Sequence, residues 1–150
     1  MSAISHRKDI MKKATKNSLY YSMGFMSQNI IWYMINTYLM LFYTDVVSLS
    51  AGAISTIMLV ARVWDAVNDP MMGVIVDKTK SKWGKFRPYI IIAPPFLAIF
   101  DILTFTVWPV EGAMKAVLCG ISYILAGMAY TAVGVAINGI VNRLSTDSNE

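Results

Sequence analysis

The sequence predicts an all-α transmembrane protein, and three observations lead to that prediction. First, 56% of its 150 residues are hydrophobic and only 15% are charged, whereas soluble domains average about 25% charged residues. Second, the apolar residues form four long stretches separated by short polar or basic connections. Third, the basic residues gather in only some of these connections, as the positive-inside rule describes for membrane proteins.

The segment before the first apolar stretch, residues 1–17, is predicted to be a cytoplasmic N-terminal lead. It is polar and basic, with Arg7, Lys8, Lys12, Lys13 and Lys16. A signal peptide is disfavoured, because the stretch that follows is too long and too polar for a signal h-region and no small-residue cleavage site follows it.

The first predicted membrane helix covers residues 18–44. It is expected to tilt, because 27 residues at about 1.5 Å each exceed a hydrocarbon core of about 30 Å. Several polar or amphipathic side chains share about one third of its circumference: Gln28, Asn29, Trp32, Tyr33 and Asn36. We expect this stripe to line a cavity; the alternative is hydrogen bonding between helices, which polar membrane residues also provide.

The second predicted membrane helix, residues 51–76, carries three charged residues on one face. Asp65 follows Arg62 by three positions and precedes Asp69 by four, so the three side chains share a side of the helix. An ionised Asp at mid-membrane costs ~2.5–3.5 kcal/mol, so such a residue is read as functional. A structural ion pair between Arg62 and one Asp is the alternative, but it leaves the second carboxylate unexplained. Ser50 is the predicted N-cap of this helix.

The remaining chain supplies a basic loop, residues 77–88, and two further predicted helices, 89–108 and 113–140, joined by an outer turn. The third helix contains Asp101, which is expected to pair with a basic residue of a helix beyond residue 150 or, alternatively, to lie hydrated near the outer surface. The fourth helix could allow close helix contact through recurring glycines: Gly112, Gly120, Gly127, Gly134 and Gly139.

The charge distribution predicts that both ends of the four-helix stretch are cytoplasmic. Five basic residues precede the first helix, five more follow the second, and Arg143 follows the fourth, against Lys115 near the outer turn. The net charge of +4 therefore reflects membrane topology, and a nucleic-acid-binding surface is excluded. A single cysteine, Cys119, rules out a disulfide within the chain.

Four sequence runs resemble the N-terminal part of the glycoside–pentoside–hexuronide cation symporters, a branch of the major facilitator superfamily. The runs are YLMLFYTDVV at 38–47, VARVWDAVNDPMMG at 60–73, SKWGKFRP at 81–88 and GMAYT at 127–131. The resemblance implies a fold of about twelve helices in two halves, with the substrate site between them. Residues 18–150 would supply the first four helices of the N-terminal bundle, so a fragment is expected whose partner is the rest of its own full-length chain.

The same resemblance implies the roles of particular residues. Asp65 and Asp69 would bind the coupling cation, as ligands of the metal if it is Na⁺, and Thr131 would add an oxygen beside them. The predicted substrate cavity joins the stripe residues Gln28, Asn29, Trp32 and Asn36 with Arg62 and Asn138, and the resemblance implies a gating loop that contains Gly84 and Arg87. Three positions depart from the pattern of the melibiose-transporting members, because Asn29 and Gly134 stand where acids are expected and Asn138 replaces a sugar-stacking aromatic.

These features predict a multi-pass plasma (inner) membrane symporter that couples Na⁺ or H⁺ entry to uptake of a sugar, glycoside or hexuronide. No cofactor besides the coupling ion is expected, and the partners are the small-molecule substrate and the lipid bilayer. One alternative is a related carrier of a lipid-like substrate. An enzyme that uses the Asp pair is disfavoured, because the only histidine, His6, lies in the lead and no second acidic motif accompanies the pair.

Overall fold

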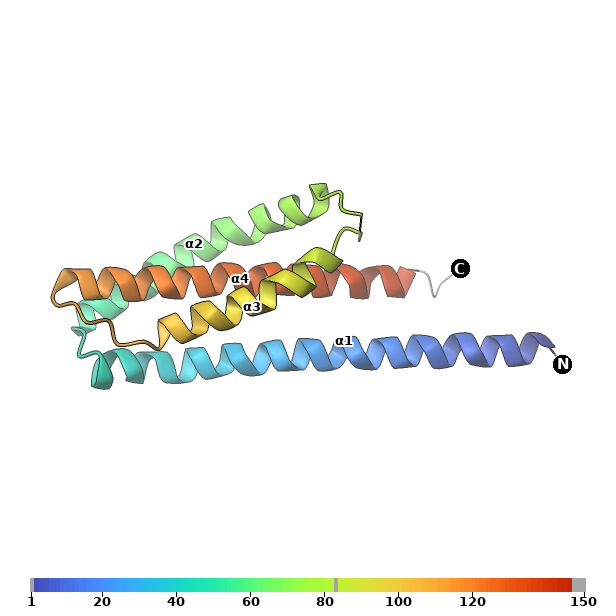
Figure 1. Cartoon of the computed structure of the whole chain (residues 1–150), viewed down its shortest axis with the longest axis horizontal. Helices are drawn as coiled ribbons and strands as arrows, with labels where there is room; N and C mark the ends of the chain where they lie inside the picture. The colour runs from blue at the N-terminus through green and yellow to red at the C-terminus, as the bar shows by residue number, and fades with distance from the viewer. Residues whose placement is uncertain (1, 83, 147–150) are drawn as a thin grey trace.

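The computed structural model describes the backbone of residues 2–82 and 84–146, with side chains for residue 15 and for residues 18–82 and 84–140. Throughout this described part the chain is helical, without strands. The elements are α1 (Ser2–Leu41), the π-helix η1 (Phe42–Val46), α2 (Ala51–Lys78), α3 (Arg87–Thr104) and α4 (Ala113–Thr146). The helices run up and down beside one another, and the α2–α3 connection lies at the end where α1 begins and α4 finishes (Figure 1).

α4 is the central helix, since it packs against α1, α2 and α3. At three of the five predicted positions, Gly127, Gly134 and Gly139, an added Cβ would come closer than ordinary contact distance, whereas Gly120 has room for one. A Cβ added to Gly120 would meet Ile57 of α2 at 3.5 Å, and one added to Gly139 would overlap the Phe86 ring. Gly127 and Gly134 approach polar side chains of α2 and α1. The fifth glycine, Gly112, has open space around it and a φ of +65°, so it serves the turn before α4 rather than helix packing.

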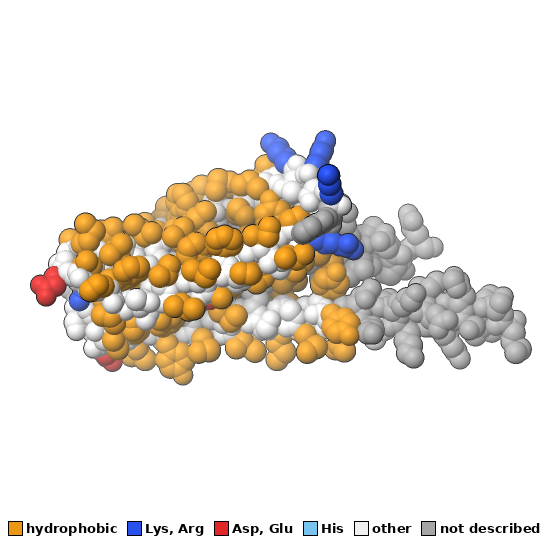
Figure 2. Space-filling view, viewed as in Figure 1, with side chains coloured by type: hydrophobic (Ala, Val, Ile, Leu, Met, Phe, Trp, Pro, Cys, Tyr) orange, Lys and Arg blue, Asp and Glu red, His pale blue; other side chains and the backbone are white. Residues whose placement is uncertain are grey.

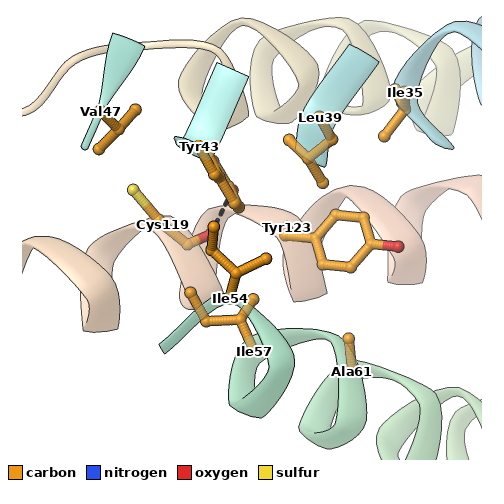
Figure 3. Packing of buried hydrophobic residues seen from close by; sticks show 9 residues of the cluster. All are labelled: Ile35, Leu39, Tyr43, Val47, Ile54, Ile57, Ala61, Cys119 and Tyr123. Atoms are coloured by element: carbon orange, nitrogen blue, oxygen red, sulfur yellow. Dashed lines mark hydrogen bonds between the residues drawn. The ribbon is translucent and has the colours of Figure 1, made fainter. Parts of the chain in front are cut away.

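The larger hydrophobic cluster lies at the end of the bundle where α1 meets η1. Its buried members are Ile35, Leu39, Tyr43, Val47, Ile54, Ile57, Ala61, Cys119 and Tyr123. Figure 3 shows the Tyr43 ring directed from η1 toward α4, where its hydroxyl donates a 3.0 Å hydrogen bond to the carbonyl oxygen of Cys119. The phenol can therefore be buried without leaving its polar group unpaired.

The largest differences between the predicted helix ends and the structure are in three places. The lead is not a separate segment, because α1 starts at Ser2 and continues into the first predicted span; the sequence contains no Gly or Pro before Gly24 that would interrupt it. α4 extends to Thr146, beyond the predicted end at 140. The Ser50 cap was correctly predicted, since its hydroxyl accepts the Ala53 N–H at 3.3 Å.

The third difference concerns α3, which ends at Thr104 and not at 108, so the outer connection is longer than predicted. The Phe105 N–H still closes onto the Asp101 carbonyl, but the Phe105 ring packs on Phe42 at a centroid distance of 5.3 Å. Trp108 packs against the same hydrophobic cluster. Pro109 also disfavours a helical conformation at the residue before it. Burial of the two aromatic rings therefore outweighs continuation of the helix.

Within the described residues, two helical stretches, Arg87–Thr104 and Ala113–Ile140, are long and apolar enough to cross a membrane by length and composition. Polar and charged side chains such as Gln28 and Asp65 lower the mean hydropathy of α1 and α2. Apolar side chains nevertheless cover much of the described surface seen in Figure 2. The four-span topology therefore stays a prediction.

Candidate cation and substrate site

Two of the three carboxylates of α2, those of Asp65 and Asp69, lie against α4. Asp69 Oδ1 accepts a hydrogen bond of 2.9 Å from the hydroxyl of Thr131. The Asp65 carboxylate, half-buried, lies beside Gly127, where an added Cβ would stand 3.3 Å from Oδ1. Because Gly127 and Thr131 are four residues apart, one side of α4 meets both carboxylates. The structure thus brings together the three residues that the resemblance assigned to the cation.

Arg62 does not pair with either carboxylate. Among the described residues the one ion pair within 4.0 Å is Lys85 Nζ to Asp77 Oδ1, at 2.7 Å. The Arg62 side chain is exposed. A structural Arg–Asp ion pair is therefore not what holds the carboxylates of α2 in place.

Asn68 is a candidate site residue that the sequence reasoning missed. Its side chain is completely buried on α2, and neither its Oδ1 nor its Nδ2 has a hydrogen-bond partner among the described residues. A buried amide without partners is costly, so native structures retain one where an ion, a water or a moving group can satisfy it. Its position three residues after Asp65, on the stripe that also carries the buried Ala61, was the signal available in the sequence.

These groups have the donor chemistry of a small hard cation. Such ions take carboxylate, hydroxyl and amide oxygens, and Asp65, Asp69, Thr131 and Asn68 supply all three kinds. No cluster of three or more His, Cys, Asp or Glu side chains occurs in the described part of the chain. Such a set of oxygens suits a hard cation better than a transition metal, which prefers nitrogen and sulfur ligands.

Gln28 is placed between α1 and α4. The side chain is buried, and its Nε2 donates a 3.0 Å hydrogen bond to the Tyr130 carbonyl oxygen. The same nitrogen lies 3.2 Å from the position of a Cβ added to Gly134. Gln28 thus occupies the space that a side chain at position 134 would need, which gives a physical reason for glycine there.

Trp32 lies one turn beyond Gln28 and stacks on Tyr130 of α4, with ring centroids 4.3 Å apart and planes 19° apart. The ring of Tyr123 is nearly parallel to the same indole, with the planes 9° apart and the centroids 6.4 Å apart. The three rings form an aromatic wall across the α1–α4 contact. Such faces pack against the apolar faces of sugar rings as well as against each other.

The remaining polar residues predicted for the cavity point away from the α1–α4 contact. Asn29 and Asn36 each donate to the carbonyl four residues earlier in α1, Phe25 and Trp32, both at 2.8 Å. Asn36 is exposed, as is Asn138 of α4, while Asn29 is partly buried. The predicted polar stripe of α1 therefore divides: Gln28 and Trp32 hold α4, whereas Asn29 and Asn36 are available to other partners.

The predicted gating loop is tied to both helices that it joins. Gly84 has a φ of +93°, which glycine adopts without steric cost, and its N–H bonds the Ser81 carbonyl at 3.0 Å. The Thr79 and Tyr89 hydroxyls are 2.7 Å apart. Arg87 is the exposed first residue of α3. Asp101, further along α3, buries one carboxylate oxygen without a hydrogen-bond partner among the described residues.

Long antiparallel helices with polar groups between them and an apolar exterior define the class of polytopic helical membrane proteins. Comparison with known proteins gives the family. Residues 20–150 match the family described as MFS/sugar transport protein, and the chain belongs to that family.

Three curated relatives indicate the branch. The chain is 40% identical over 131 residues to the isoprimeverose transporter of Lactiplantibacillus pentosus, covering 87% of the chain and 27% of that protein. It is 35% identical over 135 residues to the putative glycoside/cation symporter YagG of Escherichia coli strain K12, and this match covers 90% of the chain and 29% of YagG. It is 32% identical over 128 residues to the glucuronide carrier protein homolog of the same strain, and this match covers 83% of the chain and 28% of that protein.

These comparisons confirm the resemblance to glycoside–pentoside–hexuronide cation symporters. The chain spans less than a third of the length of the curated relatives it matches. The family is one of integral membrane transport proteins and not of enzymes, so the enzymatic use of the Asp pair is set aside.

Proposed function

We propose that the complete protein containing this chain is a symporter that couples entry of Na⁺ or H⁺ to uptake of a sugar or glycoside across the plasma membrane. The observation that carries this proposal is the contact between Asp69 of α2 and Thr131 of α4, with Asp65 one turn away. A sugar or glycoside as substrate is supported by the names of three relatives: an isoprimeverose transporter, a putative glycoside/cation symporter and a glucuronide carrier homolog.

In this proposal the cation neutralises the two carboxylates and joins α2 to α4. Two carboxylates one helical turn apart repel each other when the site is empty, and a bound cation removes that repulsion. The cation therefore favours a closer approach of the two helices. A movement of α4 toward α2 would also alter a substrate site between α1 and α4. The reason is that α4 carries both Thr131 and the Tyr130 ring, which stacks on Trp32. Coupling between two sites needs such a shared element.

For the substrate, we predict a neutral pentoside or glycoside, or a hexuronide, over a melibiose-like galactoside. Asn29 and Gly134 leave the site with less negative charge than two acids would, and neutral amides suit hydroxyl-rich ligands. The test is uptake by the complete protein in energised vesicles, with and without a Na⁺ gradient, of isoprimeverose, a galactoside and a glucuronide. Strong Na⁺-driven melibiose accumulation that Asn29→Ala and Asn138→Ala leave unchanged would contradict this version of the site.

The orientation is proposed from the basic residues, with the N-terminus and the α2–α3 connection in the cytoplasm. Replacing Lys78, Lys80, Lys82 and Lys85 together by glutamine should weaken insertion or scramble topology. The measurement is labelling of a cysteine introduced at Ser81, in a Cys119→Ser background, by a membrane-impermeant reagent. Intact cells should protect this cysteine in the otherwise unchanged protein and expose it in the fourfold variant. Labelling of the unchanged protein in intact cells would overturn the orientation.

A further inference from the structure

A groove of about 510 Å³ runs between α3 and α4 toward the basic loop, outside the site described above. Ala93, Ala129 and Ala132 are small residues along its lining, which leaves room between the larger side chains. Phe96 and Phe100 follow one another along α3, with ring centroids 6.1 Å apart, and line its far part. Although α2 diverges from α4 on the way to the loop (Figure 1), Met72 of α2 and Thr79 just after it also line the groove.

The end of the groove at the loop is polar and positively charged. Thr79 and Ser81 line it there, and the neighbouring Lys78, Lys80 and Lys82 are exposed. Figure 2 shows Lys and Arg side chains gathered at this end of an otherwise apolar surface. Of the loop lysines, only Lys85 is in an ion pair with a described residue, namely Asp77. Lys78, Lys80 and Lys82 are exposed and have no ion-pair partner in the part of the chain whose side chains are described.

We propose that this groove binds an anionic phospholipid, with an acyl chain between α3 and α4 and the phosphate against Lys80 and Lys82. An apolar channel that ends in unneutralised positive charge at the level of a membrane surface matches a molecule with an acyl chain and a negative headgroup. Basic pockets between membrane helices select anionic lipids in this way. The Ser81 hydroxyl and the Thr79 side chain lie at the groove end where the glycerol region would pass.

A second groove gives a matched internal control. It also measures about 510 Å³ and is lined by apolar residues of α2 and α4, among them Ala53, Val60, Val117 and Ile121. It lies toward the other end of the bundle, where the adjoining hollow is lined by Glu111 and Lys115, one charge of each sign. An acyl chain fits both grooves equally well, so a preference for an anionic headgroup should occur at the first groove alone.

The experiment is photolabelling of the complete protein in phosphatidylcholine vesicles. The vesicles carry a trace of phosphatidylglycerol or of phosphatidylcholine, each with the same photoactivatable acyl chain, and labelled peptides are mapped by mass spectrometry. Peptides of the first groove, around Phe96 and Met128, should be labelled roughly tenfold more by the anionic lipid. Peptides around Val117 and Ile121 should be labelled equally by both. High salt should reduce the preference at the first groove, since it screens exposed charges.

Variants then test the contribution of the lysines. Lys80→Gln combined with Lys82→Gln should reduce the tenfold preference to about twofold or less, while Lys115→Gln should leave it intact. Equal labelling of the first groove by both lipids in the unchanged protein would overturn the proposal, whatever the variants do. Absence of labelling there by either lipid would overturn it as well, because another segment of the complete protein would then cover the groove.

Discussion

Asp69→Asn in the complete protein is expected to abolish ion-driven accumulation of the substrate, while the protein keeps part of its substrate binding or substrate exchange. The carboxylate of Asp69 accepts the Thr131 hydroxyl at 2.9 Å, so asparagine can keep the hydrogen bond but loses the charge. Loss of a unit charge about 4 Å from a cation, at a partly exposed site, should weaken cation affinity on the order of 100-fold. The measurement compares uptake driven by a Na⁺ or proton gradient with exchange of labelled for unlabelled substrate.

Controls for this experiment come from the same chain. Asp45→Asn removes an exposed carboxylate of η1, away from α4, and should accumulate substrate normally. Thr131→Ala should lower cation affinity less than Asp69→Asn does, and Thr131→Ser should restore it because the hydroxyl is kept. If Asp65→Asn and Asp69→Asn both accumulate substrate like the unchanged protein, the cation assignment is wrong.

Gly127→Val is expected to have the second largest effect, through Asp65. A Cβ at Gly127 would stand 3.3 Å from Asp65 Oδ1, and the γ-methyl groups of valine would press further into the carboxylate. Overpacking at a close contact costs about 1–3 kcal/mol, so cation affinity should fall roughly tenfold or more. The measurement is the cation concentration needed for half-maximal uptake.

Gly120 on the same helix supplies the comparison for this substitution. Its added Cβ would meet the apolar Ile57 at 3.5 Å, which is ordinary contact distance. Gly120→Ala should leave the cation dependence unchanged, whereas Gly127→Ala should already raise the half-maximal concentration. Equal cation dependence of Gly127→Val and the unchanged protein would show that Asp65 does not need this side of α4.

The sequence alone determined which residues share a helix face and where most helices lie. Asp65 and Asp69 fall on one side of α2 because 100° per residue places positions four apart together, and the Ser50 cap follows from local chemistry. The sequence runs also sufficed to place the chain in its family. Helical periodicity does not predict how each helix is rotated relative to its neighbours, because that rotation depends on which side chains and glycines come into contact.

The contact partner of each side chain was therefore decided by the tertiary structure. Gln28 and Asn29 are adjacent in the sequence, yet Gln28 bonds the Tyr130 carbonyl of α4 and Asn29 bonds its own helix. The early end of α3 depends on the packing of Phe105 against Phe42, which lies more than sixty residues away in the chain. Asn68 is buried, with no hydrogen-bond partner among the described residues, because α2 packs with that stripe inward. Each of these outcomes follows from contacts between segments distant in sequence, which local propensity and hydropathy do not encode.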